Sequence, residues 1–185
     1  DHTIDEGQTV TFTAVATDPD EQQRLTFTLF GAPAGAQIDP QTGVFSWATT
    51  EADGPGEYPL TVRVTDDGMP ARWDSELVTI TVREVNQPPT LDPIPNQSVD
   101  EGSLLSFQAV ARDLDQPAQA LEFALVGVVP DGAFIHEATG EFSWTPAENH
   151  GPASHTINIR VTDDGVPPSS STRSFVVVVN EVDDA

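Results

Sequence analysis

Acidic motifs recur along this chain, and their side-chain oxygens are the groups best suited to do chemistry. Asp5-Glu6-Gly7 returns as Asp100-Glu101-Gly102, and Asp18-Pro19-Asp20 returns as Asp113-Leu114-Asp115, in both cases 95 residues later. Carboxylates bind hard cations or act as general acids and bases, and on many surfaces they only face water. For any one carboxylate taken alone, solvation is the better interpretation. Whether the whole set binds a cation or takes part in catalysis depends on how the secondary-structure elements place the motifs.

Longer segments repeat as well. Arg63-Val64-Thr65-Asp66-Asp67-Gly68 matches residues 160–165, 97 residues later, and the connector Glu84-Val85-Asn86-Gln87-Pro88-Pro89 has an acidic counterpart at residues 181–185. Matched landmarks at near-constant spacing indicate a tandem duplication. We therefore predict two domains, 1–86 and 87–185, with a connector centred on 84–89. Because the sequence has no initial Met and no signal sequence, we expect it to be a piece of a longer protein.

The composition excludes several functions. Thirty acidic residues face seven basic ones, all Arg, which gives a net charge of -23. This charge repels nucleic acid and anionic membrane surfaces. The absence of Cys excludes thiol catalysis, disulfides and Cys-ligated zinc, and no apolar run is long enough to cross a membrane. We expect an extracellular or cell-surface protein whose isolated fragment is monomeric.

Apolar residues alternate with polar ones in both halves, which predicts β-strands with one face on a core. The clearest such runs, which recur in the second half, are Val10-Phe12-Ala14-Ala16, Leu25-Phe27-Leu29, Phe45-Trp47, Tyr58-Leu60-Val62-Val64 and Val78-Ile80-Val82. Gly, Pro and Asp turns separate them, and no stretch has a sustained helical period. The predicted fold is all-β: two tandem Greek-key sandwiches of about seven strands each, arranged end to end.

This fold would gather the acidic motifs at the ends of the sandwiches. At the junction we expect seven oxygen-bearing residues to converge: Glu6, Glu51, Glu84 and Asn86 from the first domain, with Asp113, Asp115 and Asp163 from the second. Two carboxylates about 5 Å apart repel by roughly 1 to 3 kcal/mol, so the cluster needs a cation. Calcium takes six to eight hard oxygens in irregular geometry, and no Cys or clustered His offers a softer metal a site.

These motifs resemble those of cadherin repeats. The similarity is closest to the bacterial cadherin-like (dystroglycan-type) repeats, through Glu6, Ala16-Thr17-Asp18-Pro19-Asp20, Gly43-Val44-Phe45, Val62 to Gly68 and the Asn-x-Pro-Pro connector. The resemblance implies an immunoglobulin/cadherin-like sandwich with calcium between successive domains. It adds Gln87 to the ligand set above. It also implies outer half-sites that await neighbouring repeats, made by Asp18, Asp20 and Asp66 at one end and by Glu101, Glu148, Glu181 and Asp183 at the other.

The chain departs from the animal cadherin pattern in two places. Thr49-Thr50-Glu51 stands where an Asp-Arg-Glu is expected, and Gln87 stands where an Asp is expected. Each change removes a negative ligand. We therefore expect one or two ions, held at about 10⁻⁴ to 10⁻³ M as in extracellular modules. Asp53 and Asp67 are weaker ligand candidates, because His150 stands at the position that matches Asp53.

Aromatic residues and histidines suggest alternatives. Trp47 and Trp144 occupy matching strands, which favours a core role, whereas Trp73 has no aromatic counterpart and is assigned to the loop after Asp66-Asp67-Gly68. The four His residues are scattered, and none has a repeated partner. Paired carboxylates could serve glycoside hydrolysis, but acids at the ends of both sandwiches do not form one catalytic cleft. The sequence also has no nucleophile motif and no phosphate-loop motif. We therefore predict that the chain is not an enzyme.

The first functional hypothesis is a calcium-binding spacer or adhesion segment of a larger surface or secreted protein, in which calcium stiffens the interdomain junction. Its partners would be neighbouring repeats of the same chain and a cell-surface ligand. The alternative is a carbohydrate-binding module of a secreted polysaccharide-degrading enzyme or adhesin, with Trp73 stacking on a sugar. Homophilic recognition would need an apolar anchor at the N-terminal tip, and residues 1–4 offer none.

Overall fold

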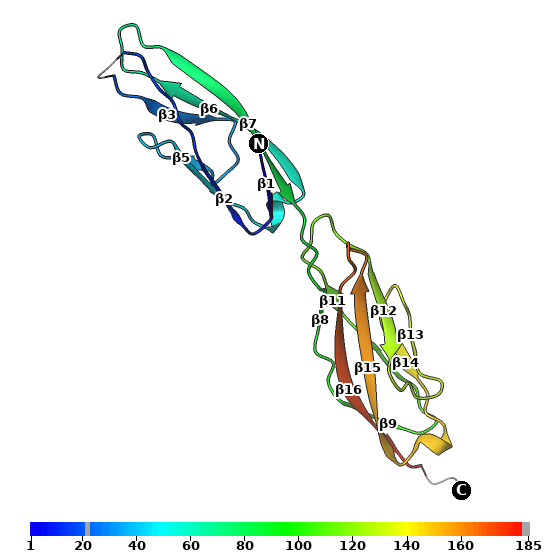
Figure 1. The fold of residues 1–185 in the computed structure, drawn as a ribbon. Helices are drawn as coiled ribbons and strands as arrows, with labels where there is room; N and C mark the ends of the chain where they lie inside the picture. Colours follow the sequence, from blue (N-terminus) through cyan, green and yellow to red (C-terminus); the bar gives the residue numbers. More distant parts are fainter. Residues whose placement is uncertain (21–22, 183–185) are drawn as a thin grey trace. The chain divides into compact units, whose positions relative to one another are not determined.

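The computed structural model describes residues 1–20 and 23–182. Contacts group the chain into two units, Asp1–Val85 and Asn86–Ala185, each built from β-strands (Figure 1). The predicted all-β class is confirmed. Within the described residues the helical segments are two single turns of 3₁₀ helix, η1 (Glu51–Asp53) and η2 (Glu148–His150). No helix in this part of the chain has the length and apolar character needed to span a membrane.

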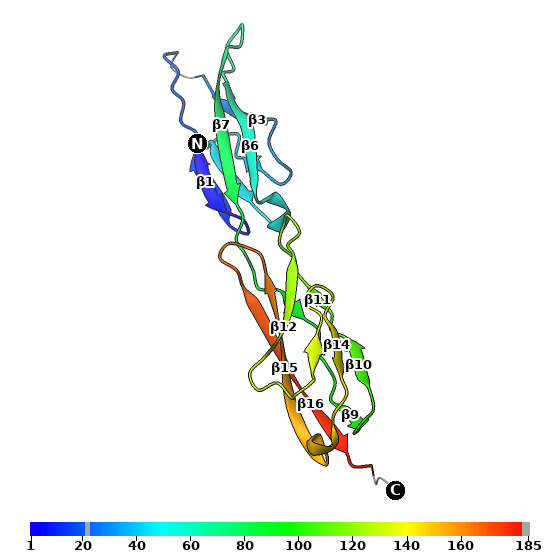
Figure 2. The same ribbon diagram turned by 90° about the vertical axis from the view of Figure 1, so that its right-hand side faces the viewer.

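The first unit is a sandwich of two sheets. Its described strands are β1 (His2–Asp5), β2 (Thr9–Thr13), β3 (Thr26–Phe30), β4 (Gln37–Ile38), β5 (Val44–Ala48), β6 (Gly56–Thr65) and β7 (Trp73–Arg83). One sheet has the order β1-β7-β6-β3 and the other the order β2-β5-β4. β1 runs parallel to β7, and the other neighbours are antiparallel. The chain changes sheet between β1 and β2, so their connecting turn lies at one end of the sandwich (Figures 1 and 2).

The second unit repeats this plan with more breaks in its strands. Its described strands are β8 (Thr90–Leu91), β9 (Gln97–Asp100), β10 (Leu105–Gln108), β11 (Ala111–Arg112), β12 (Leu121–Val126), β13 (Phe134–Ile135), β14 (Glu141–Trp144), β15 (Ala153–Asp163) and β16 (Ser170–Asn180). The sheets are β12-β15-β16-β9 and β10-β14-β13, with a short β11-β8 pair beside them. Only the β11-β8 pair has no counterpart among the described strands of the first unit.

Each unit has a core made of the alternating residues. Trp47 and Trp144 are both 1% exposed, so the predicted core role is confirmed. Each indole nitrogen donates a hydrogen bond to a carbonyl thirteen residues earlier, Trp47 to Ala34 at 3.1 Å and Trp144 to Asp131 at 3.0 Å. A buried indole needs such a partner. The cores therefore repeat in their polar contacts as well as in their apolar residues.

The turn before β5 shows how local sequence shapes the sandwich. The Asp39 carboxylate accepts hydrogen bonds from the backbone amides of Gln41 and Thr42, at 2.9 and 2.7 Å. These hydrogen bonds lower the pKa of Asp39, and the bond from the Thr42 amide has the larger effect. Gly43 follows with φ of +70°, and a Cβ there would lie 2.3 Å from the Ala14 carbonyl oxygen. Glycine is therefore required both for the backbone angle and for close packing against Ala14, the residue that follows β2.

Tyr58 is the chain's only tyrosine, and its ionisation should report the fold of the first unit. Its hydroxyl donates to the Asp53 carbonyl at 2.8 Å, and burial, with a smaller effect of the Asp53 charge, raises the pKa of Tyr58 above 10.0. Folding thus favours the neutral phenol. This contribution to stability is fully present below the unfolded pKa and is lost as pH rises through the higher folded pKa. Ultraviolet difference absorbance should show phenolate forming at higher pH in the folded chain than in denaturant. An equal or lower midpoint in the folded chain would contradict the assignment, and Tyr58→Phe provides the blank.

Candidate metal centre

Three glutamates meet at one end of the first unit. Glu6 follows β1, Glu84 follows β7 and Glu51 opens η1. Because β1 and β7 are parallel, with Asp5 beside Arg83, Glu6 and Glu84 leave adjacent strands at the same end of the sheet (Figure 1). One carboxylate oxygen from each of the three residues lies within 4.8 Å of the other two. Three like charges at this distance repel unless a cation or protons neutralise them.

Glu6 is held firmly at this end. Its side chain is 8% exposed, and its Oε1 accepts a hydrogen bond from the Val85 amide at 3.1 Å. Its Oε2 is buried and has no hydrogen-bond partner in the described part of the chain. A Cβ on Gly54 would lie 2.2 Å from this Oε2, so the carboxylate lies against bare backbone. Sequence reasoning missed Gly54, although its recurrence as Gly151, 97 residues later, was a usable signal.

The second unit repeats the glutamate cluster at its C-terminal end. Carboxylate oxygens of Glu101, Glu148 and Glu181 also lie within 4.8 Å of one another. Glu101 is again 8% exposed and accepts from the Val182 amide at 2.9 Å, while its Oε2 has no partner among the residues described. A fourth residue predicted here, Asp183, lies outside the described residues. The arrangement thus occurs in both units, with the same burial and the same backbone donor to the first glutamate.

A different acidic group lies at the N-terminal end of the second unit. Asp163 Oδ1 accepts from the Gly165 amide at 3.0 Å, the Ser169 amide at 2.8 Å and Asn86 Nδ2 at 3.1 Å. Asp115 Oδ2 accepts from the Gln87 amide at 2.8 Å. Asp113 Oδ1 accepts from the Asp115 amide at 3.0 Å. One oxygen of each aspartate is therefore fixed by protein donors.

The other oxygen of each of these aspartates is bare. Asp113 Oδ2, Asp115 Oδ1 and Asp163 Oδ2 are buried and have no hydrogen-bond partner in the described ranges. Asp115 and Asp163 are only 2% and 4% exposed. A buried ionised carboxylate oxygen without a partner is costly, and a hard cation bound beside it would satisfy it. The donor set, oxygen only and anionic, fits calcium.

Gln119 belongs to this group, and sequence reasoning missed it. Its Nε2 donates to Asn86 Oδ1 at 2.6 Å and to Asp115 Oδ2 at 3.0 Å, and its Oε1 is buried without a partner among the described residues. It thus offers a fourth bare oxygen. The sequence carried a weak signal, because Gln23 occupies the matching place in the first half, 96 residues earlier.

The structure sorts the eight predicted ligands into two sets. Glu6, Glu51 and Glu84 belong to the first unit, and Asn86, Gln87, Asp113, Asp115 and Asp163 belong to the second. That both sets bind the same ions stays a prediction. The two weaker candidates have structural contacts: Asp53 Oδ2 accepts from the amide and hydroxyl of Thr50 at 2.7 and 2.8 Å, and Asp67 Oδ1 accepts from the Arg24 amide at 2.9 Å.

The view that the histidines are scattered is wrong for two of them. His150 and His155 lie 5.7 Å apart, ring centre to ring centre, and both contact the Trp144 ring edge-on. His150 Nδ1 accepts from the Ala147 amide at 2.9 Å, and His155 Nε2 lies 2.8 Å from the His150 carbonyl. These bonds order the η2 turn, which carries Glu148. Their role is to shape the turn beside the glutamates.

The placement of Trp73 in a loop is also wrong, because Trp73 is the first residue of β7. It is 61% exposed, and the Arg63 guanidinium carbon lies 4.4 Å from its ring centre and 5.9 Å from that of Phe30. Arg63 is on β6, so this stack is a cross-strand contact on the outer face of the sheet. A cation over an aromatic face is an attractive contact.

Replacing Gly54 by Ala should loosen the glutamate cluster of the first unit. The new methyl would displace the Glu6 carboxylate and break its bond to Val85, at a cost of about 1 to 3 kcal/mol for a hydrogen bond to a charged group. The measurement is a double-mutant cycle in denaturant, with Gly54→Ala made in wild type and in Glu6→Ala. The cost should nearly vanish in the Glu6→Ala background. Equal costs in both backgrounds would show that the methyl acts elsewhere.

The geometry defines the class of protein: two tandem cadherin-like sandwiches with acidic clusters at the ends of their strands. Residues 1–83 and 88–180 match the model of the family described as "Putative Ig domain" (He_PIG). The chain belongs to this family.

Individual relatives agree with this class. The chain is 30% identical over 157 residues to protocadherin Fat 4 of mouse and 32% identical over 192 residues to protocadherin-16 of rat, covering 80% and 96% of this chain. It spans only 3% and 6% of the length of those proteins. Among solved structures, repeats EC1-2 of human protocadherin-24 superpose with a TM-score of 0.62 at 18% identity, covering 98% of this chain and 95% of that one. The predicted resemblance to cadherin-like tandem repeats is confirmed.

Proposed function

We propose that this chain is a calcium-binding, extracellular pair of repeats, a non-catalytic spacer or adhesion segment of a larger surface or secreted protein. The observation that carries the proposal is the group Asp113, Asp115 and Asp163, in each of which one carboxylate oxygen is fixed by the protein and the other is buried without a hydrogen-bond partner among the described residues. Buried anionic oxygens that lack a protein donor are suited to a hard cation. Calcium would supply positive charge at this site, and the chain's own amides orient the ligands.

In the sequence, the connector links the two acidic groups: Glu84 opens it, and Asn86 and Gln87 contact aspartates of the second unit. The first unit contributes Glu6, Glu51 and Glu84, and the second contributes Asp113, Asp115 and Asp163. Asn86 and Gln87 lie between Glu84 and Asp113 in the sequence. Only Val85 and Asn86 separate Glu84 from Gln87. Ions held by oxygens from both sides of so short a segment would limit its motion. Calcium would thereby turn a hinge into a stiffer joint, and neighbouring repeats would be the natural partners.

The expected affinity supports an extracellular location. With one or two ions and a missing acid at Gln87, we expect dissociation constants of about 10⁻⁴ to 10⁻³ M, the range of extracellular modules. Sites this weak fill only where calcium is abundant. The net charge of -23 is consistent with a cation-rich setting.

Calorimetric titration tests the site, and solution scattering tests the stiffening. Glu84→Gln should weaken calcium binding, and chelation of wild type should broaden the distribution of particle dimensions. Glu57→Gln, an exposed change of the same chemistry on β6, is the matched control. Calcium-independent scattering curves together with unaltered binding in Glu84→Gln would sink the proposal.

One observation favours a second candidate, carbohydrate binding. Trp73 and Phe30 are 61% and 52% exposed on either side of Arg63, whose Nε is buried without a partner in the described part of the chain. Aromatic rings beside a donor suit a sugar face. Retention on insoluble polysaccharide, lost in Trp73→Ala, would support this function, and a glycan array without binding would count against it.

A further inference from the structure

Four Asp-Gly pairs occur in the chain, and at such pairs the backbone itself can rearrange. They are Asp53-Gly54, Asp67-Gly68, Asp131-Gly132 and Asp164-Gly165. The glycine amide nitrogen attacks the side-chain carboxyl carbon of the aspartate and expels water, which closes a succinimide ring. Water then reopens the ring, and one product is isoaspartate, whose main chain runs through the former side-chain carboxyl carbon. One water is released and one is taken up, so solvent is the only co-reactant. Glycine has no Cβ to obstruct the attack.

In two of the pairs, both reacting groups are engaged elsewhere. The Asp67 carboxylate accepts from the Arg24 amide at 2.9 Å, and the Gly68 amide donates to the neighbouring Asp66 at 3.0 Å. The corresponding bonds of the second unit have lengths of 2.8 and 3.0 Å. Ring closure in either pair would have to break two hydrogen bonds first.

The Asp53-Gly54 pair is restrained from both sides. Asp53 Oδ2 accepts from the amide and the hydroxyl of Thr50, at 2.7 and 2.8 Å, so the carboxylate is turned back along η1. Gly54 lies against the Glu6 carboxylate, because a Cβ there would be 2.2 Å from Glu6 Oε2. The peptide after Asp53 therefore has little room to turn towards the Asp53 side chain.

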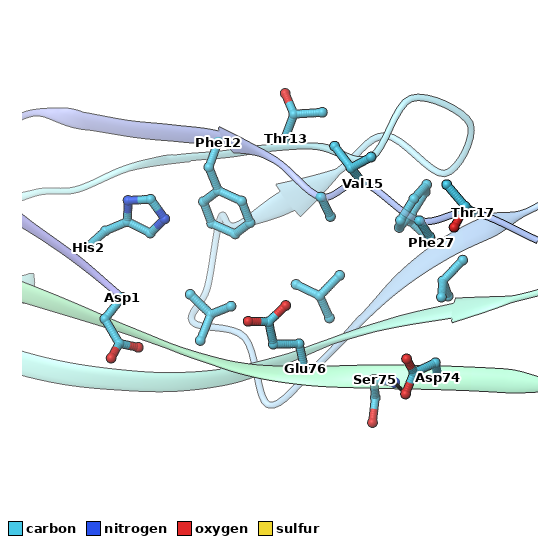
Figure 3. Close-up of a pocket in the computed structure, with 15 residues that line it drawn as sticks. Asp1, His2, Phe12, Thr13, Val15, Thr17, Phe27, Asp74, Ser75 and Glu76 are labelled. Atoms are coloured by element: carbon cyan, nitrogen blue, oxygen red, sulfur yellow. Dashed lines mark hydrogen bonds between the residues drawn. The ribbon is translucent and has the colours of Figure 1, made fainter.

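Asp74 precedes another small residue, Ser75, and both line the hollow between the two sheets of the first unit (Figure 3). Strand pairing holds this backbone, with Asp74 opposite Val64 and Ser75 opposite Arg63. The Ser75 amide donates to Asp74 Oδ1 at 2.8 Å. Ring closure consumes the amide hydrogen and turns the peptide plane, so it requires this part of β7 to leave the sheet.

Asp131 and Gly132 lack these restraints. Both are exposed and form the corner of a turn in which the Ala133 amide donates to the Pro130 carbonyl at 3.1 Å. A Cβ on Gly132 would meet no atom within 4 Å, so the turn faces open solvent. Within the described part of the chain, neither the Asp131 carboxylate nor the Gly132 amide has a hydrogen-bond partner. The nucleophile and the carboxyl group are both free to react.

The first unit contains the same turn without the aspartate. The Ala36 amide donates to the Pro33 carbonyl at 3.2 Å, and Gly35 has a φ of +82°, against +80° at Gly132. Ala34 stands where the second unit has Asp131. Because alanine has no carboxyl group, the first unit cannot undergo the reaction at this turn and serves as an internal reference.

We propose that Asp131 is a site of spontaneous isoaspartate formation, and that the modification loosens the core of the second unit at Trp144. The Asp131 carbonyl accepts from Trp144 Nε1 at 3.0 Å. In isoaspartate this carbonyl becomes part of a free carboxylate, and the main chain towards Gly132 gains one carbon atom. The buried indole therefore loses the backbone acceptor that the turn provides. A new carboxylate beside a side chain that is 1% exposed is also costly.

Peptide mapping after prolonged warm incubation of the full chain tests the site. All basic residues are Arg, so trypsin separates the four Asp-Gly pairs into four different peptides. Isoaspartate is counted by methylation of its free carboxyl with an isoaspartate-specific methyltransferase. In the folded chain it should accumulate severalfold faster in the peptide of residues 113–160 than in the other three. In denaturant the four rates should converge, because the protecting hydrogen bonds are lost.

Two substitutions provide matched controls. Asp131→Glu keeps the charge but lengthens the side chain, which disfavours ring closure, and Asp131→Ala copies the turn of the first unit. Both should remove the label from the peptide of residues 113–160. Residue-resolved unfolding by NMR should show that incubation destabilises the second unit of wild type and leaves its first unit unchanged. Neither unit should change on incubation of the two variants.

Three results would overturn the proposal. Equal rates at all four pairs in the folded chain would show that the turn at Asp131 is not exposed to the reaction. The same ranking of rates in denaturant would assign the preference to local sequence rather than to the fold. Isoaspartate at Asp131 without a loss of stability in the second unit would refute the link to Trp144.

Discussion

Calcium at about 10 mM should raise the thermal unfolding midpoint of the chain by roughly 6 to 20 °C, and a chelator should reverse the gain. Dissociation constants of about 10⁻⁴ to 10⁻³ M correspond to a stabilisation of about 1.4 to 2.7 kcal/mol at this concentration. For a domain of fewer than about 100 residues, each kcal/mol moves the midpoint by about 4 to 8 °C. Differential scanning calorimetry with calcium and with chelator measures this directly.

The Asp115→Asn variant tests whether Asp115 contributes to this stabilisation by calcium. In calcium the variant should be less stable than wild type, because a buried anionic ligand is lost. In chelator it should be as stable or more stable, because the buried Asp115 side chain no longer carries a charge. The side-chain oxygen of Asn can still accept from the Gln87 amide, so the fold is kept. The same change in stability under both conditions would show that Asp115 has only a structural role, and Glu57→Gln should have little effect in either.

Trp144→Ala should cost the second unit about 3 to 5 kcal/mol, the largest effect of a single substitution that we expect. Trp144 is 1% exposed, contacts His150 and His155, and donates to Asp131, so its loss leaves a cavity and an unsatisfied carbonyl. The first unit has its own core and should keep its stability. Residue-resolved unfolding in denaturant by NMR should show two transitions, of which only that of the second unit moves.

This variant also tests the proposed division of the chain into domains 1–86 and 87–185. Trp47→Ala should have the converse effect: the first unit should lose stability, and the second should keep its own. Trp73→Ala, at an exposed position, should change stability by less than about 0.5 kcal/mol apart from its contact with Arg63. A single cooperative transition that shifts in both Trp144→Ala and Trp47→Ala would refute the division.

The sequence by itself determined the duplicated plan and the strands that form the cores. Alternation has a period of two, so residues such as Phe45 and Trp47 have only one way to reach a common core. The recurrence of acidic motifs at fixed spacing then identified which carboxylates follow which strands. Because strand ends in a sandwich lie at its poles, the sequence alone is enough to group Glu6, Glu51 and Glu84, which the structure brings together.

Only the tertiary structure decided which atoms of the acidic groups remain bare and what surrounds them. Gly54, Gln119 and the His150–His155 pair contribute through contacts between segments far apart in sequence, which no local pattern encodes. The placement of Trp73 on β7 depended on strand pairing across the sheet.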